Sequence, residues 1–232
     1  MYILEETTLL KVQSITKFSN DAQPTRPISF EADGGVLGVI GTEGSGKSTL
    51  LGIISGAIRA DEGKIFIDNY DISEYPNEAK RATGFLLEDN PLYDDMTPYE
   101  HLMFIGDAKG IPAEKLCKQA SEALDLLGID DTKDVLIANI KKSQRQLLGV
   151  AATLLGNPDI IILDEPLKGT TVADAERLSS VIKMLGTMKT VIISSEEASR
   201  ISGICDRFLL LPEGDFVDTV TDAIEEKEEG AE

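Results

Sequence analysis

The sequence predicts an α/β domain built on a mostly parallel β-sheet, and three observations support this fold class. Several short runs are apolar throughout, which is typical of strands covered on both faces. Segments with apolar residues at helical spacing separate these runs. Residues 88–157 are helical by contrast, without the alternation of strand and helix seen on either side. We therefore expect a single domain at 1–232, with an α/β core at 1–87 and 158–218, a helical subdomain at 88–157 and an acidic tail at 219–232.

The N-terminal part of the predicted core supplies three strands and one helix. Val36–Ile40 is an apolar strand, and the helical pattern that follows begins at Ser48 and ends near Gly56. An Asp-Glu-Gly turn introduces a second strand at Lys64–Ile67, and Gly84–Leu87 reads as a third.

Helical spacing dominates the next part of the chain. Within Thr97–Leu127, one face carries the apolar residues Leu116, Ala120, Ala123, Leu124 and Leu127. The single histidine, His101, lies in this region, and we expect it at the surface. Three apolar strands follow at Ile160–Leu163, Thr190–Ser194 and Phe208–Leu211.

Charge and composition exclude several classes of protein. The chain has 232 residues, with 22 Lys and Arg against 41 Asp and Glu, and a formal net charge of −19. Such a field repels a phosphate backbone or an anionic bilayer, so we expect no nucleic-acid partner. No apolar stretch approaches the roughly 20 residues of a membrane-spanning helix, and Cys117 and Cys205 are too few for a disulfide framework. Because the N-terminus also lacks the pattern of a secretory signal, we expect a cytoplasmic protein.

A glycine-rich loop follows the first predicted strand directly. It consists of Gly41, Thr42, Glu43, Gly44, Ser45, Gly46, Lys47, Ser48 and Thr49, with two glycines flanking four residues before Lys-Ser. Glycines let successive amide groups point inward at the start of a helix, where they form a cradle for anions. In such a loop Lys47 reaches the β- and γ-phosphates, and Ser48 is a ligand of Mg²⁺. A glycine-rich turn is the alternative, but the strand before the loop and the helix after it favour nucleotide binding.

Two carboxylates end another buried strand. Ile160–Leu163 is followed by Asp164 and Glu165, at the carboxyl end where open α/β sheets bind ligands. We expect Asp164 to hold Mg²⁺ directly or through water, and Glu165 to polarise the water that attacks the γ-phosphate. A strand that meets a polar turn is the alternative for this motif alone. Together with the glycine-rich loop, the motif predicts a site for ATP and Mg²⁺.

These motifs together resemble those of the ATP-binding subunit of ABC transporters over nearly the whole chain. Further stretches that carry the resemblance are Gly84–Thr97, Gln144–Gln146, Leu154–Asp159, Cys205–Arg207 and Glu213-Gly214. The resemblance implies a P-loop NTPase with a RecA-like core, an inserted α-helical subdomain and a small antiparallel β part. It places Phe18 where an aromatic ring stacks on adenine, with a core aromatic as the alternative. The residue sequence of Gly84–Thr97 most closely resembles that of exporter-type and gliding-motility-type members.

Four positions depart from the family's pattern, and all lie on its face for hydrolysis and dimerisation. Within Ile140–Gln144 both signature glycines are absent, and Lys141 replaces the signature serine. Glu196 stands at the switch histidine, Glu88 at the Q-loop glutamine and Thr171 at the D-loop aspartate. As an oxygen donor, the carboxylate of Glu88 could still approach Mg²⁺. Because losing one preorganised donor costs roughly 100- to 1000-fold in rate, we expect ATP binding to survive better than hydrolysis.

The resemblance also implies partners. Two such subunits would close face to face over ATP, and closure would drive a membrane-embedded transporter subunit from the inner face of the cell membrane. An asymmetric heterodimer with a signature-competent second subunit and a slow homodimer both remain open. A regulatory or scaffold protein without productive hydrolysis is the alternative function, and copurification with a membrane protein distinguishes the two. An ATPase of DNA repair or translation is disfavoured by the charge.

Overall fold

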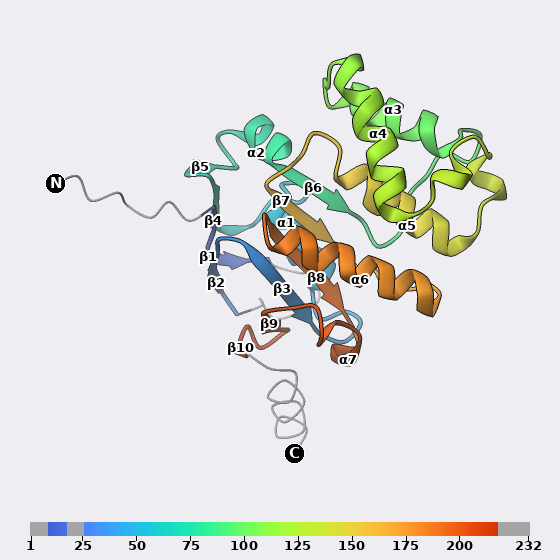
Figure 1. Ribbon diagram of the computed structural model, residues 1–232. Helices are drawn as coiled ribbons and strands as arrows, with labels where there is room; N and C mark the ends of the chain where they lie inside the picture. Colours follow the sequence, from blue (N-terminus) through green and yellow to red (C-terminus); the bar gives the residue numbers. More distant parts are fainter. Residues whose placement is uncertain (1–8, 18–25, 218–232) are drawn as a thin grey trace.

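The computed structural model describes residues 9–17 and 26–217, so Phe18 and the tail at 219–232 lie outside the described residues. Within these ranges the chain forms two β-sheets with helices packed around them (Figure 1). None of the helices in these ranges combines the length and the apolar composition needed to cross a membrane.

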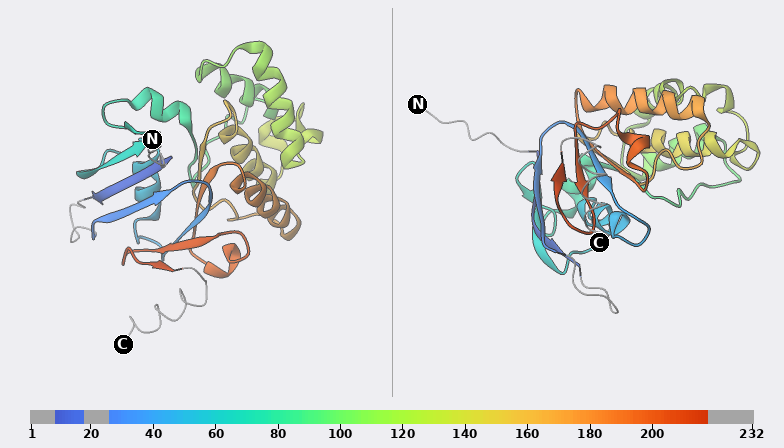
Figure 2. Two further views of the ribbon diagram at one scale, coloured as in Figure 1. Left: turned by 60° about the vertical axis from the view of Figure 1, so that its left-hand side comes forward. Right: turned by 90° about the horizontal axis from the view of Figure 1, so that it is seen from below.

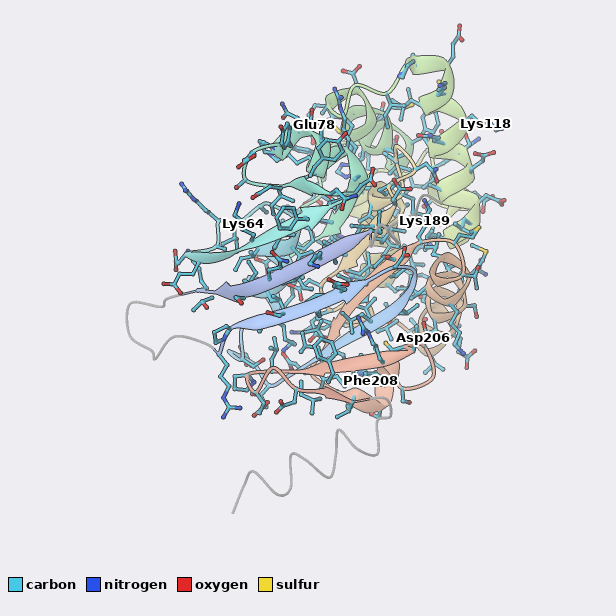
Figure 3. The ribbon with its side chains drawn as sticks, turned by 90° about the vertical axis from the view of Figure 1, so that its left-hand side faces the viewer. Lys64, Glu78, Lys118, Lys189, Asp206 and Phe208 are labelled. Carbon is cyan, nitrogen blue, oxygen red and sulfur yellow. The ribbon has the colours of Figure 1, made fainter. Side chains whose placement is uncertain are left out.

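The larger sheet confirms the predicted parallel arrangement. Its strands are β3 (Gly35–Ile40), β6 (Thr83–Leu86), β7 (Ile160–Leu163), β8 (Thr190–Ser195), β9 (Arg207–Leu210) and β10 (Phe216–Val217). They follow the order β10-β9-β3-β8-β7-β6, and every neighbouring pair is parallel except β10 with β9. Asp206, labelled in Figure 3, accepts the N–H of Val36 at 2.7 Å and ties the start of β9 to the start of β3.

The smaller sheet is antiparallel and confirms the expected β part. It consists of β1 (Leu10–Thr16), β2 (Ile28–Ala32), β4 (Glu62–Ile67) and β5 (Tyr70–Asp71), in the order β2-β1-β4-β5. Lys64, on β4 in Figure 3, donates to the buried Asp71 at 2.9 Å and links the last two strands.

Helices cover both faces of the larger sheet (Figure 2). They are α1 (Lys47–Ile54), α2 (Pro76–Ala82), α3 (Pro98–Ala108), α4 (Ala113–Leu127), α5 (Lys142–Thr153), α6 (Val172–Gly186) and α7 (Ala198–Ile201). Because side chains alternate along a strand, those on the two faces of the sheet pack into two separate hydrophobic cores. Ile160 and Ile162 of β7 pack toward α1 and the smaller sheet. Ile161 and Leu163 pack toward α5 and α6 on the opposite face.

The helical region between β6 and β7 projects to one side of the sheets (Figure 1). The predicted pattern at Thr97–Leu127 forms two helices, α3 and α4, and the chain turns between them at 109–112. Thr97 accepts the N–H of Glu100, whose carboxylate accepts the N–H of Thr97, so a capping box begins α3. The predicted apolar face of α4 is buried, which confirms that expectation; short 3₁₀ turns at Asp130–Thr132 and Ile137–Asn139 lead to α5.

His101 is buried, with 2% of its surface exposed, so the prediction of a surface residue is wrong. Its ring lies 5.8 Å from the ring of Tyr93, and Tyr93 also contacts Phe104 at 5.3 Å between centroids. The segment at 89–97, which comes before α3, thus contributes to the cover over this face of the helix. The spacing of apolar residues within α3 could not predict the burial of His101, because the side chain that covers it comes from outside the helix.

Candidate nucleotide-binding site

The glycine-rich loop at 41–49 joins β3 to α1 at the carboxyl edge of the larger sheet. Gly44 and Gly46 have φ angles of 79° and 96°, which glycine adopts without steric cost. A Cβ at Gly41 would lie 2.2 Å from Ser45 Oγ, so the loop also needs a glycine at its first position. This backbone turns tightly over the start of α1, where the amide groups of the first helical turn have no intrahelical partner.

Lys47, the first residue of α1, is 6% exposed beneath this loop. Its Nζ donates to the carbonyl oxygens of Gly41 and Thr42 at 2.8 and 3.1 Å, and it lies 3.8 Å from Oε1 of Glu165. Ser45 Oγ is buried in the same loop without a hydrogen-bond partner. A buried ammonium and an unsatisfied hydroxyl beside free amide groups suit the oxygens of a phosphate chain.

Asp164 and Glu165 follow β7 as predicted and are 1% and 8% exposed. Ser194, at the end of β8 on the neighbouring strand, holds both of them. Its Oγ accepts the N–H of Glu165 at 2.8 Å and donates to Oδ1 of Asp164 at 2.6 Å. No sequence motif predicts the role of Ser194, because that role depends on the pairing of β7 with β8.

The carboxylate of Glu165 is incompletely satisfied. Its Oε1 is buried without a hydrogen-bond partner. Burial raises the pKa of Glu165 above its ordinary value, and the nearby charge of Lys47 opposes that rise. A carboxylate with raised proton affinity at the edge of a phosphate site can act as a base toward water.

A cavity of about 180 Å³ brings the loop together with two of the departing positions. It is lined by Glu43, Gly44, Gly46, Lys47, Ser48, Thr49, Glu88 and Glu196. The fold therefore places two candidate Mg²⁺ ligands, Ser48 and Glu88, around one space. Glu196 lines the same space.

Lys168 also belongs to this region, although no motif in the sequence predicts it. Its Nζ lies 2.6 Å from Oε1 of Glu88 and 4.0 Å from Oε1 of Glu196. Lys168 follows Glu165 by three residues, and this short separation is the only feature of the sequence that places Lys168 near the site. Its two acidic neighbours come from the segment after β6 and the segment after β8, so only the folded chain assembles the group.

Lys141, Lys142 and Thr171, which we expected to be departures from the family's pattern, lie at helix starts. Lys141 and Lys142 are exposed at the beginning of α5, where the N–H of Lys141 donates to Oε1 of Gln144 at 3.0 Å. Thr171 caps α6 by accepting the N–H of Asp174 at 3.2 Å. Lys141 and Thr171 therefore occupy the N-cap positions of α5 and α6.

Among the described residues, no group of three or more His, Cys, Asp or Glu side chains is arranged to hold a metal ion. This fits Mg²⁺, which is usually held by one or two carboxylates together with substrate phosphates and water.

A parallel sheet, a glycine-rich loop running into a helix over a buried lysine, and a carboxylate pair at the end of β7, two strands from β3, define a P-loop NTPase. The family model described as ABC transporter matches residues 26–168, so the chain belongs to the ABC transporter family. It is an ATP-binding subunit of that family.

Curated relatives agree with this assignment. An uncharacterized ABC transporter ATP-binding protein of Methanocaldococcus jannaschii is 31% identical over 210 residues, covering 90% of this chain and 76% of the relative. The linearmycin resistance ATP-binding protein LnrL of Bacillus subtilis is 28% identical over 211 residues, covering 90% of this chain and 68% of the relative.

Solved structures show the same fold. The structure of cbiO1 from Clostridium perfringens has a TM-score of 0.81 at 24% identity and covers 96% of this chain and 93% of that chain. The ATP-binding cassette MJ0796, in a dimeric post-hydrolysis state bound to ADP and Pi, has a TM-score of 0.80 at 22% identity. That likeness covers 90% of this chain and 98% of MJ0796.

Proposed function

We propose that this chain binds ATP with Mg²⁺ in the loop at 41–49 and works, on the cytoplasmic face of a membrane, on a membrane-embedded transporter subunit. The observation that carries the proposal is the buried Lys47 beneath the loop, next to the unsatisfied hydroxyl of Ser45. When a phosphate chain enters, Lys47 exchanges its bonds to the carbonyl oxygens of Gly41 and Thr42 for charge-assisted bonds to phosphate. The proposal includes the division of the chain into an α/β core at 1–87 and 158–218, a helical subdomain at 88–157 and an acidic tail at 219–232.

The chain's own residues provide a place for the metal and for the attacking water. Ser48, Asp164 and Glu88 would hold Mg²⁺ together with phosphate oxygens, and the ion would neutralise charge that develops on the phosphates. Ser194 fixes the orientation of Asp164 through its 2.6 Å bond. Glu165 would orient water and accept its proton, with Ser194 holding its backbone.

We also propose that hydrolysis by this chain alone is very slow. Glu196 cannot donate a hydrogen bond to a γ-phosphate, and Lys141 lacks the fixed amide geometry of a glycine-rich signature. Productive turnover therefore needs a second ATP-binding subunit, preferably a different one that supplies a complete signature, whereas a homodimer would be slow. Turnover of several ATP per second by the purified chain would contradict this part of the proposal.

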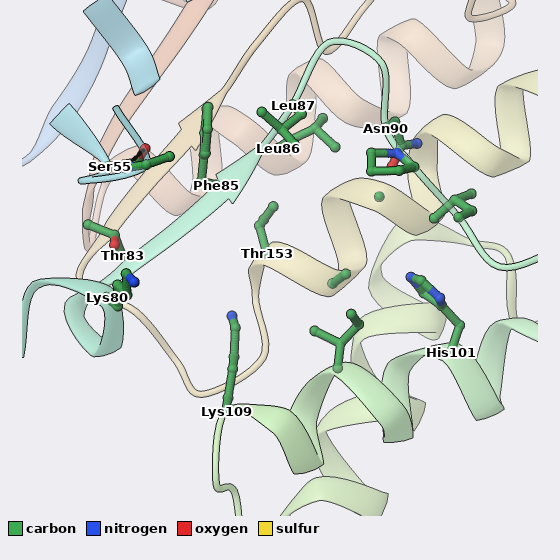
Figure 4. Close-up of a pocket in the computed structure, with 16 residues that line it drawn as sticks. Ser55, Lys80, Thr83, Phe85, Leu86, Leu87, Asn90, His101, Lys109 and Thr153 are labelled. Atoms are coloured by element: carbon green, nitrogen blue, oxygen red, sulfur yellow. Dashed lines mark hydrogen bonds between the residues drawn. The ribbon is translucent and has the colours of Figure 1, made fainter. Parts of the chain in front are cut away.

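A groove between the core and the helical region offers a surface for the membrane subunit (Figure 4). The cavity measures about 350 Å³ and is lined by apolar residues of β6 and α5, with Lys80 and Lys109 at its wall. An amphipathic segment with acidic residues fits such a surface. The relatives include a lipopolysaccharide export protein of Haemophilus influenzae, and cbiO1 is part of the cbiONQ complex. An exporter-type partner is proposed from the residue pattern of Gly84–Thr97 alone, because the relatives also include the methionine import ATP-binding protein MetN of Carboxydothermus hydrogenoformans.

The decisive experiment measures ATP binding to Lys47→Ala by titration calorimetry with Mg²⁺. Charge-assisted hydrogen bonds contribute about 1.5–3 kcal/mol, so we expect the Kd for ATP to rise about 10- to 100-fold. Lys118→Ala, which removes an exposed lysine of α4, is the matched control and should bind like the wild type. Equal affinities of wild type and Lys47→Ala would overturn the proposed site.

A further inference from the structure

Lys168 is the cation between the two carboxylates that replace neutral residues in the family's pattern. It lies in the loop between β7 and α6, where its backbone N–H donates to the carbonyl oxygen of Glu165 at 3.0 Å. That turn keeps the side chain close to the phosphate site. Its Nζ donates to Glu88 at 2.6 Å and is 4.0 Å from Glu196. The contact with Glu88, followed by the charges of Glu196 and Glu165, raises the pKa of Lys168, which therefore stays charged at neutral pH.

The two carboxylates face the space that a triphosphate would occupy. Glu88 and Glu196 both line the 180 Å³ cavity that contains Lys47 and Ser48. Lys168 approaches from the other side of Glu88, because it lines an adjoining cavity of about 410 Å³ together with Glu88 and Glu165. Without a cation, two negative charges at this wall would add to the repulsion that a molecule of net charge −19 already exerts on phosphate.

We propose that Lys168 is a positioning residue for ATP, which neutralises Glu88 and Glu196 so that the last phosphate can approach Lys47. The inference rests on the ATP-binding function and concerns only the charge balance at the γ-phosphate end of the site. The same pairing keeps the Glu88 carboxylate at the cavity wall, where a metal bound to the phosphates would meet it.

The effect of Lys168 falls on ligand binding and not on folding. The side chains of Lys168, Glu88 and Glu196 are 55%, 39% and 41% exposed, and ion pairs with this exposure contribute little to stability. The charge of Lys168 has a larger effect on a bound phosphate, because the two groups would interact at short range inside a partly enclosed space. Removal of the Lys168 ammonium should therefore leave the midpoint of thermal unfolding of the free protein close to that of the wild type.

The test is a mutant cycle read by calorimetric titration of the full chain with ATP and with ADP in the presence of Mg²⁺. For Lys168→Met we expect the Kd for ATP to rise about tenfold, with a smaller rise for ADP, which lacks the phosphate nearest the two carboxylates. Lys168→Arg keeps the charge and should restore most of the affinity. In the Glu88→Gln/Glu196→Gln background, Lys168→Met should change the Kd for ATP by less than about twofold.

The control is Lys183→Met, which removes one charge from the exposed last turn of α6 and should leave both affinities unchanged. An unchanged Kd for ATP in Lys168→Met would overturn the proposal. So would an equal loss of affinity in the double-glutamine background, because that result assigns Lys168 a structural role independent of the carboxylates. Failure of the wild type to bind ATP would instead overturn the function on which the inference rests.

Discussion

Lys47 and Glu165 face each other in the interior, and Glu165 has fewer partners than its burial requires. Their charged atoms are 3.8 Å apart, and Oε1 of Glu165 has no hydrogen bond. Burial raises the pKa of Glu165 more than Lys47 lowers it, so the fold tolerates an ionised group in an unfavourable place. Groups that are destabilised in the free protein gain most when a ligand satisfies them. The same two residues were the ones that the motifs predicted, because each is fixed by a short sequence pattern.

At His101 the fold favours the neutral imidazole. Burial lowers the pKa of His101, so the unfolded chain takes up its proton at a higher pH than the folded chain does. The stability that this preference contributes is fully present above the unfolded pKa of about 6.5 and is lost as the pH falls through the folded pKa. We expect the midpoint of thermal unfolding to fall between about pH 7.5 and about pH 5.5, and to fall less in His101→Leu than in the wild type.

The carboxylates also change the stability over this pH interval, but they do so equally in the wild type and in His101→Leu. The difference between the two proteins therefore reports the contribution of His101. If His101→Leu and the wild type lost the same stability over this interval, the imidazole would not be held neutral by burial.

At the scale of elements, one glycine determines how α5 lies on the larger sheet. A Cβ at Gly84 of β6 would lie 2.2 Å from the carbonyl oxygen of Thr153, the last residue of α5. Because that atom belongs to the backbone, the helix would have to move as a unit. The close contact therefore fixes the distance between the core and the helix that begins at the signature positions.

Gly84→Ala should lower the free energy of unfolding by about 1–3 kcal/mol, as overpacking does in well-packed interiors. Urea denaturation measures the change. Gly203→Ala is the matched control, since a Cβ at Gly203 meets no atom within 4 Å, and its effect should stay within about 0.5 kcal/mol. Similar values for the two variants would show that α5 can shift on β6 without cost.

The elements that the sequence predicted correctly are those that short patterns specify. The strand at Val36–Ile40, the loop and the helix after it follow from apolar runs and glycines that are close together in the sequence. The structure places both strand ends and the helix start within one residue of the prediction, and the helix ends at Ile54, two residues before the expected Gly56. The burial of His101 depends instead on a segment outside its helix, at 89–97, and the position of Lys168 depends on segments that are distant in the sequence. Glu88 and Lys168 are 80 residues apart, and no local pattern records that they meet. Electrostatic pairs of this kind become visible only when the sheet order is known.

For the whole molecule, net charge governs how two copies approach each other. Each copy carries a formal charge of −19, so the closure of two identical chains over ATP brings two strongly anionic bodies together. Locally, the exposed Lys141 and Lys142 at the start of α5 would attract the phosphates of an opposing copy. Salt weakens both effects, but in opposite directions: it relieves the global repulsion and reduces the local attraction.

The global charge outweighs two lysines, so higher salt should favour association. In Glu165→Gln, which prevents proton transfer to Glu165 and so preserves ATP, we expect the dimer fraction with Mg²⁺ and ATP to rise between about 0.05 M and about 0.5 M NaCl, as the Debye length shortens from more than 10 Å to a few ångströms. Sedimentation velocity measures that fraction. The double variant Lys47→Ala/Glu165→Gln, which lacks the phosphate contact, should remain monomeric at both salt concentrations. A dimer that dissociates as salt increases would show instead that the lysines at the start of α5 dominate, and that the altered signature still grips phosphate across the interface.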